Sequence, residues 1–313
     1  STHHYINDYE LLSLVIENGE NYNRAYYKLW ELLLNDEIVF KKDFHLISLA
    51  EAPGNFVKCV QSLLPKSWLD YIICTKLDDK ETTSQNDFFE KYKNNIFGYK
   101  KGSLKIVENP GYNGDLTNPQ EIDTFIEFIN STDKLADLIT ADGGMDKKTD
   151  EDYMFEEYNH LPLFLGETIV ALFTQKIGGT FVLKMYDTLY INSINLLHIL
   201  SAFYETVKII KPYTSRPCNS EKYIKCINFT GIPNDNKTIL KTNLLNILSD
   251  LNKSKKDKYI YFDMLDGLTA QINLNNNNEK IKDFNSGIVV KTRALYTEHI
   301  YDILVRKDEE EIK

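Results

Sequence analysis

The sequence predicts an α/β fold, with a seven-stranded, mostly parallel β-sheet that carries helices on both faces. Two observations support this class. Short apolar stretches alternate with helical patterns up to Phe229, and strands separated by helices form βαβ units with a parallel sheet. Polar and charged residues directly follow several of these apolar stretches, as is typical of open sheets that bind ligands at their carboxyl edge.

Seven short apolar stretches are the expected strands. In chain order they are His45–Ala50, Trp68–Cys74, Ser103–Val107, Ala136–Thr140, Thr180–Met185, Val207–Ile210 and Tyr223–Phe229. The last stretch follows the sixth after a short connection, which indicates a hairpin at one edge of the sheet. We therefore expect the last strand to run antiparallel to the others.

Helical patterns precede and separate most of these stretches. In the first, Asn23–Phe40, apolar residues recur at helical spacing. The others are Asn55–Leu64, Pro119–Asn130, Glu151–Ile177 and Ile191–Tyr204. Beyond Gly231 the alternation stops, and the chain ends in a polar tract and an acidic run. We expect one domain over residues 1–230 and a small helical extension with a frayed acidic tail over residues 231–313.

Composition limits the function classes. The 313 residues include 36 basic and 46 acidic side chains, a net charge of −10, which argues against a general polyanion binder. A local basic patch is still compatible with nucleic-acid binding. The four cysteines form no CxxC pair and the histidines have no zinc-type spacing, so we expect reduced thiols and no metal. Without a signal peptide or a long apolar stretch, the protein is expected to be soluble and intracellular, with no membrane contact.

Two glycine-containing segments follow predicted strands. L-A-E-A-P-G-N-F, Leu49–Phe56, leaves a strand and opens a helix whose N–H groups point at the turn. T-A-D-G-G-M-D, Thr140–Asp146, places Asp142 directly after a strand, where open α/β sheets bind ligands. An ordinary tight turn or a helix N-cap is the structural alternative for each.

Two further segments carry charged residues at strand ends. Lys184 lies near the end of an apolar strand in G-G-T-F-V-L-K-M-Y, where a lysine is poor packing material. K-P-Y-T-S-R-P-C-N-S-E-K-Y, Lys211–Tyr223, places Glu221 at the start of the seventh strand. Because all four segments occur in order along the same alternation of predicted strands and helices, we expect their charged side chains to share one crevice.

The order of these motifs resembles the FtsJ-like family of RNA ribose 2′-O-methyltransferases. The resemblance implies a Rossmann-like class I S-adenosylmethionine (SAM) methyltransferase fold with a Lys-Asp-Lys-Glu tetrad. R-A-Y-Y-K-L-W-E, Arg24–Glu31, is similar to the family segment with the first lysine, so the implied catalytic residues are Lys28, Asp142, Lys184 and Glu221. A surface ion-pair cluster is the alternative for the first segment. Lys184 would either deprotonate or orient the 2′-hydroxyl.

The resemblance also implies the cofactor site. SAM is expected at Glu51, Ala52, Pro53, Gly54, Asn55 and Phe56, at Asp142, and at Asp115 in Y-N-G-D-L-T-N-P, whose carboxylate would contact the adenine amino group. The family usually has a second glycine where this chain has Asn55. Asparagine tolerates left-handed backbone angles better than most residues, so the turn is expected to survive.

The segment K-P-x-x-S-R-P-x-N-S-E-x-Y is most similar to cap-specific mRNA methyltransferases of large cytoplasmic DNA viruses. This implies methylation of the ribose 2′-hydroxyl of the first transcribed nucleotide of capped mRNA, with other capping enzymes as partners. The implied location is the cytoplasm, a viral factory or a virion, and the nucleus is the second choice. The expected RNA contacts are Arg24, Tyr186, Ser215, Arg216 and Asn219, with Lys41, Lys42, Lys147 and Lys148 near phosphates. The alternatives are an rRNA or tRNA 2′-O-methyltransferase and a non-catalytic protein that binds RNA or a partner. The aromatic residues that would hold a cap guanine cannot be chosen from sequence.

Overall fold

A computed structural model describes residues 23–34, 38–76, 83–92, 94–97, 113–144, 155–216 and 219–254. Its centre is a seven-stranded sheet with the order β3-β2-β1-β4-β5-β7-β6. The strands are β1 (Phe44–Leu49), β2 (Leu69–Cys74), β3 (Ile96–Phe97), β4 (Ala136–Ala141), β5 (Gln175–Met185), β6 (Tyr204–Ile210) and β7 (Lys222–Phe229). Only β7 runs antiparallel, between β5 and β6, which confirms the predicted fold class.

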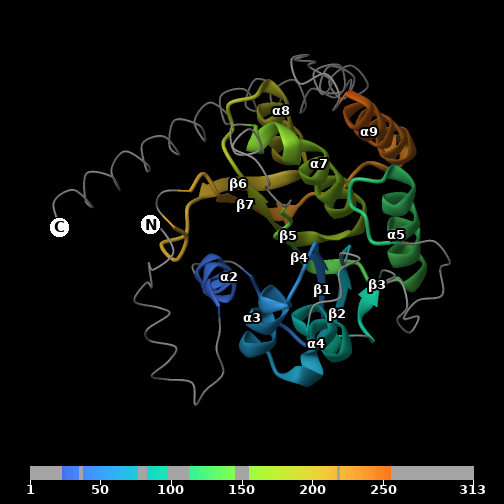
Figure 1. Ribbon diagram of the computed structural model, residues 1–313. Helices are drawn as coiled ribbons and strands as arrows, with labels where there is room; N and C mark the ends of the chain where they lie inside the picture. The colour runs from blue at the N-terminus through green and yellow to red at the C-terminus, as the bar shows by residue number, and fades with distance from the viewer. Residues whose placement is uncertain are drawn as a thin grey trace.

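Helices cover both faces of the sheet (Figure 1). One face carries α2 (Arg24–Leu34), α3 (Asn55–Leu63) and α4 (Thr83–Tyr92); the other carries α5 (Pro119–Thr132), α7 (Glu156–Thr174), α8 (Ile191–Phe203) and α9 (Asn234–Ser254). Each layer has its own apolar cluster, because successive residues of a strand point to opposite faces. In β1, for example, Leu46 belongs to the first layer and Ile47 to the second.

The third strand differs from its prediction. The expected stretch, Ser103–Val107, lies outside the described residues, and the third strand of the sheet is the two-residue β3. Helix α4 precedes it and was not predicted. Its sequence, TSQNDFFEKY, is mostly polar, and among its side chains whose burial is described Phe88 and Tyr92 mark an inward face. Such a short apolar signal does not distinguish a helix from a loop.

The boundary between α7 and β5 also differs. The helical pattern was expected to continue to Ile177, but the helix ends at Thr174 and the strand begins at Gln175. Gln175 pairs with Ala136 of β4, and its side chain amide donates to the Ala136 carbonyl at 3.1 Å. These contacts between distant parts of the chain determine the boundary, and periodicity does not report them.

Helix α9 completes the second layer. Leu240, Leu244, Leu248 and Leu251 join the same apolar cluster as residues of α5 and α7. Lys241 forms an ion pair with Asp123 at 2.5 Å, and the side chain of Asn252 donates to the Thr117 carbonyl at 2.6 Å. The helix therefore packs as part of the sheet's cover, although it lies in the segment expected to form an extension. No helix in the described ranges is long and apolar enough to span a membrane.

The strand order fixes where a ligand site can form. Strands β2 and β3 lie on one side of β1, and β4 and the later strands lie on its other side. The carboxyl ends of β1 and β4 therefore border a topological switch point, where open α/β sheets bind their ligands. Cys59, Cys74 and Cys226 are buried; Cys218 lies outside the described residues.

The packing of α9 leads to a prediction about stability. Leu244→Ala should lower the free energy of unfolding by about 2–4 kcal/mol, because it leaves a cavity at a fully buried site. Ile239→Ala is the matched control in the same helix, since its side chain is exposed. Denaturant titration measures both, and equal losses in the two variants would contradict the packing of α9 described above.

Candidate active site

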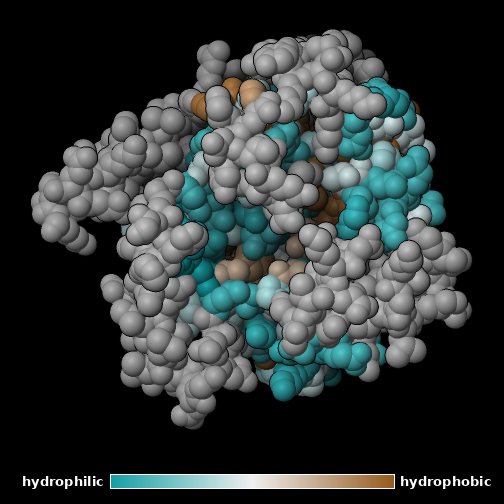
Figure 2. Space-filling model, viewed as in Figure 1, coloured by the Kyte–Doolittle hydropathy of each residue, from teal (hydrophilic) through white to brown (hydrophobic). Residues whose placement is uncertain are grey.

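The four tetrad residues converge at the carboxyl edge of the sheet. Lys184 Nζ lies 3.2 Å from Asp142 Oδ1 and donates to the Asp142 carbonyl at 2.9 Å. Lys28 Nζ, from α2, lies 2.6 Å from Glu221 Oε1. The two ion pairs thus bring together α2, the loop after β4, the end of β5 and the start of β7. The surface is hollowed between α2 and the ends of β4 and β5, with hydrophilic residues around it (Figure 2).

Both ion pairs are largely shielded from water. The exposed fractions of the side chains are 13% for Lys28, 11% for Glu221, 11% for Lys184 and 20% for Asp142. Burial alone raises the pKa of Glu221, but the charges of Lys28 and then Lys184 outweigh it, so the pKa is lowered and Glu221 is ionised. The influence of Lys184 on Glu221 shows that the two pairs belong to one charged cluster.

Lys184 keeps its proton in this arrangement. Burial alone lowers its pKa, but attraction to Asp142, with smaller effects of Tyr186 and Glu221, more than reverses this and leaves the pKa raised. Lys184 is therefore a cation that donates a hydrogen bond to Asp142. This favours its orienting role over its role as a base.

Tyr223 is a site residue that the sequence analysis missed. Its hydroxyl donates to Asp142 Oδ1 at 2.8 Å, and its ring is fully buried. Burial, followed by the negative charge of Asp142, raises the pKa of Tyr223, so it remains a donor. A signal existed in the sequence: Tyr223 lies two residues after Glu221 and therefore on the same side of the strand. It is also the cross-strand partner of Lys184.

The segment before β7 is held by its own side chains. Ser215 Oγ donates to Glu221 Oε1 at 3.0 Å, and Lys211 Nζ donates to the Glu221 carbonyl at 2.8 Å. Lys211 Nζ also donates to the backbone carbonyl and to the side-chain oxygen of Asn219. Of the expected RNA contacts in this segment, the buried Ser215 thus binds Glu221 directly, whereas Asn219 and Arg216 are exposed.

The other expected RNA contacts are spread over the molecule. Arg24 lies on α2, one turn before Lys28. Tyr186 is buried, and its ring centroid lies 4.7 Å from that of His160. Lys41 pairs with Asp137 at 2.9 Å at the amino end of β4, so the expectation that it lies near the crevice is wrong. Lys42 is exposed, and Lys147 and Lys148 lie outside the described residues.

The first cofactor loop forms a tight turn into α3. Gly54 has φ +90° and is the N-cap of the helix, and the Ala52–Pro53 peptide is cis. Asn55 is the first residue of α3 and is buried, so the left-handed conformation expected there occurs at Gly54. A side chain at Gly54 would place its Cβ 2.4 Å from the Tyr92 ring. A bulky substitution would therefore disturb α4 as well as any ligand.

Asp115 lies beside the end of β2. Its carboxylate accepts from Lys76 Nζ at 2.7 Å and from the Thr117 amide and hydroxyl at 2.9 and 2.7 Å. Burial raises the pKa of Asp115, but the hydrogen bonds from Lys76 and Thr117 outweigh it and leave the pKa lowered. The carboxylate is therefore ionised and suited to accept a hydrogen bond from an amino group. Lys76, whose side chain is 60% exposed, has room to move aside.

Glu167 is an unexpected carboxyl beneath the site. It is fully buried on α7, where the backbone of Gly143 approaches its carboxyl group and no side chain among the described residues forms a hydrogen bond with it. A Cβ at Gly143 would lie 2.5 Å from Glu167 Oε1, so a larger residue there would force the carboxyl group to shift. Burial strongly raises the pKa of Glu167, and nearby Lys184 does not offset this. Burial thus favours the protonated form, and the position of Glu167 within the apolar stretch of α7 gave no signal in the sequence.

Glu51 is also buried at the switch point. Ser48 Oγ donates to its Oε2 at 3.2 Å, and Ser48 also contacts Thr140 of β4 at 2.9 Å. Burial, and then the charge of Asp142, raises the pKa of Glu51 to about 7. Glu51, Asp142 and Glu167 together place three carboxyl groups around the ends of β1 and β4, where Lys184 is the neighbouring cation. This acid-rich site fits a positively charged ligand.

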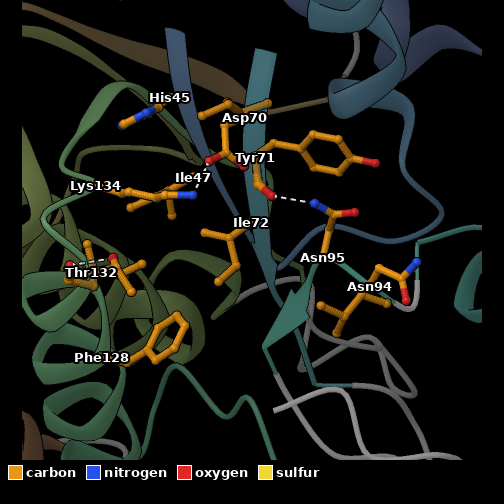
Figure 3. Close-up of a pocket in the computed structure, with 13 residues that line it drawn as sticks. His45, Ile47, Asp70, Tyr71, Ile72, Asn94, Asn95, Phe128, Thr132 and Lys134 are labelled. Carbon is orange, nitrogen blue, oxygen red and sulfur yellow. Dashed lines mark hydrogen bonds and ion pairs between the residues drawn. The ribbon is translucent and has the colours of Figure 1, made fainter. Parts of the chain in front are cut away.

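A second hollow lies at the opposite end of the sheet (Figure 3). This cavity of about 190 Å³ lies between β1–β3 and the end of α5. His45 and Asp70 line it at the amino ends of their strands, and Lys134 pairs with Asp70. The tetrad and the cofactor loop lie at the carboxyl edge, so this cavity is not the candidate active site. Within the described ranges no three His, Cys, Asp or Glu side chains are grouped to hold a metal ion.

The pKa of Glu51 makes a prediction about stability and pH. Because the pKa is about 7 in the folded protein and 4.5 in an ordinary setting, protonation favours the folded state. The free energy of unfolding should fall as pH rises from about 4.5 to about 7, by about 3 kcal/mol from this group. Glu51→Gln should remove this component. Denaturant titrations at several pH values test it, and parallel pH profiles for the variant and the parent protein would contradict it.

Comparison with known proteins agrees with this geometry. Residues 22–229 match the FtsJ-like methyltransferase family. A probable methyltransferase of African swine fever virus is 27% identical over 233 residues, which cover 72% of this chain and 54% of that protein. The cap-specific mRNA (nucleoside-2′-O-)-methyltransferase 1A of Caenorhabditis briggsae is 32% identical over 226 residues, covering 68% and 24%. The chain thus spans about half or less of the length of these relatives.

Among solved structures, a putative ribosomal RNA methyltransferase of Plasmodium falciparum has a TM-score of 0.46 and 23% identity, covering 67% of this chain and all of that one. The family match extends from the start of α2 to the end of β7 and includes all four tetrad residues. The chain therefore belongs to the FtsJ-like methyltransferase family.

Proposed function

We propose that this chain is a SAM-dependent methyltransferase that methylates the ribose 2′-hydroxyl of the first transcribed nucleotide of capped mRNA. The observation that carries the proposal is the convergence of the Lys28–Glu221 and Lys184–Asp142 pairs in one shielded crevice. Relatives named as cap-specific mRNA 2′-O-methyltransferases support the substrate class.

The residues at the switch point fit the cofactor. SAM supplies a methyl group bound to a positively charged sulfur, and the site offers Asp142 and the buried Glu51 as negative or ionisable partners. Gly54 opens the turn at the N-terminus of α3, and the ionised Asp115 is available for an amino group. These are the residues that would hold the cofactor.

The tetrad would position and activate the hydroxyl. Methyl transfer needs the acceptor oxygen in line with the methyl group and the sulfur, and it needs a route for the hydroxyl proton. Charged Lys184 can hold the oxygen by donating a hydrogen bond, while Asp142 and Tyr223 fix the direction of the ammonium group. Lys184 can accept the proton only after it has lost its own. Lys28 and Glu221 complete the wall of the crevice.

Lys184 provides the sharpest test of the mechanism. Lys184→Ala should lower the methylation rate by at least about 100-fold, because it removes the orienting or proton-accepting group. SAM binding should remain near normal, since the cofactor loop is untouched. Lys184→Arg should not restore activity, because the guanidinium is larger, planar and always charged. Substantial 2′-O-methylation by Lys184→Ala would rule out this mechanism; calorimetry with SAM is the control.

The substrate is tested by comparing short RNAs that differ only at the 5′ end. With labelled SAM, we expect methylation of capped RNA at the first transcribed nucleotide and little methylation of the uncapped strand. Equal methylation of both would favour an rRNA or tRNA enzyme. SAM binding without methylation of either would favour a non-catalytic binding protein. Lys184→Ala is the matched control for contaminating activity.

A further inference from the structure

We propose that Tyr213 is a stacking residue that holds an RNA base at the entrance of the crevice, presented there by Glu31. This inference rests on the proposed RNA substrate. Of the Phe, Tyr and Trp side chains whose exposure is described, two are exposed: Tyr213 at 67% and Trp68 at 37%. Trp68 immediately precedes β2 and so lies at the amino edge of the sheet. Tyr213 is therefore the exposed aromatic residue on the tetrad side.

The backbone of Tyr213 is fixed by helix α2. Glu31 Oε1 accepts from the Tyr213 amide at 2.8 Å, and Glu31 Oε2 accepts from the Thr214 amide and hydroxyl at 3.2 and 3.3 Å. A turn closes beneath the ring, because the Ser215 amide donates to the Pro212 carbonyl at 3.0 Å. Pro212 and Thr214 are buried on either side of the exposed ring.

The backbone of Tyr213 is also close to the tetrad. Ser215 follows Tyr213 by two residues, which span at most about 7 Å, and its hydroxyl donates directly to Glu221. Lys28, the partner of Glu221, lies one turn before Glu31 on α2. The helix that contributes Lys28 therefore also sets the position of the turn that carries Tyr213. The exposed Arg216 adds a positive charge beside the same turn.

These contacts give the ring a physical role. A single exposed apolar side chain is ordinary on protein surfaces and by itself needs no explanation. Here three hydrogen bonds to the Glu31 carboxylate hold the turn that carries the exposed ring, next to the tetrad. Little conformational entropy is therefore lost when a base stacks on that ring. Unpaired bases commonly stack on aromatic side chains, and every base has a face for this. The ligand is thus an unpaired base, either the cap guanine or a base of the transcript.

The experiment measures binding of a labelled short RNA, capped or uncapped, to the full chain by fluorescence anisotropy, with methylation kinetics in parallel. Tyr213→Ala should weaken RNA binding by about 10-fold or more and raise the KM for RNA similarly, with kcat and SAM binding within about 2-fold. Tyr213→Phe should retain affinity, since it keeps the ring. Trp68→Ala, the control at the opposite edge, should have no effect. Glu31→Gln should give an intermediate loss of RNA affinity.

The outcomes separate the sources of the base. A loss confined to capped RNA identifies the cap guanine, and equal losses on both strands identify a transcript base. RNA affinity of Tyr213→Ala within about 2-fold of the parent protein overturns the inference, as does a loss in Tyr213→Phe as large as in Tyr213→Ala. Because binding requires no methyl transfer, a parent protein that binds RNA without methylating it refutes the proposed activity and still decides the role of Tyr213.

Discussion

The ion pair between Lys28 and Glu221 is the interaction on which the arrangement of the site depends. It joins the first described helix to the start of β7, residues that are far apart in the chain. A buried pair of this kind adds little net stability, because removing two charges from water costs about as much as their attraction returns. Breaking it would leave one charge buried and unpaired, which is much more costly. The pair therefore specifies the position of α2 more than it stabilises the fold.

Other contacts to α2 agree with this interpretation. Lys225, buried in β7, donates to the Leu32 carbonyl at 2.8 Å, near the end of the helix. Glu31 binds the turn before β7, and the hydroxyl of Tyr26 contacts Ser62 of α3 at 2.8 Å. Helix α2 is thus attached both to the strand that follows Glu221 and to the helix that follows the cofactor loop. A movement of α2 would displace both sides of the crevice together.

The sequence predicts the architecture through local signals, and it predicts the tetrad through the resemblance of four segments to the FtsJ-like family. The alternation of apolar stretches and helical patterns predicts the sheet. Asp142 follows a predicted strand, Lys184 lies near the end of one, and Glu221 lies at the start of another. Tyr223 was within reach of the same argument, through its spacing from Glu221. Glu167 and Tyr213 were not, since one is defined by its approach to Gly143 and the other by its hydrogen bonds to α2. The exposure of a tyrosine and the isolation of a carboxyl are tertiary properties that no spacing along the chain reports.

The two buried acids at the switch point differ in how they can respond to a ligand. Burial raises the pKa of Glu167, and the nearby cation Lys184 does not reverse this. Glu51, with a pKa of about 7, is poised between its two forms at neutral pH, and ionising it costs only about RT. A cationic ligand near Asp142 would therefore complete the ionisation of Glu51 at little cost. The same fold thus provides one acid whose protonated form is favoured by burial and one acid whose charge can adjust to the ligand.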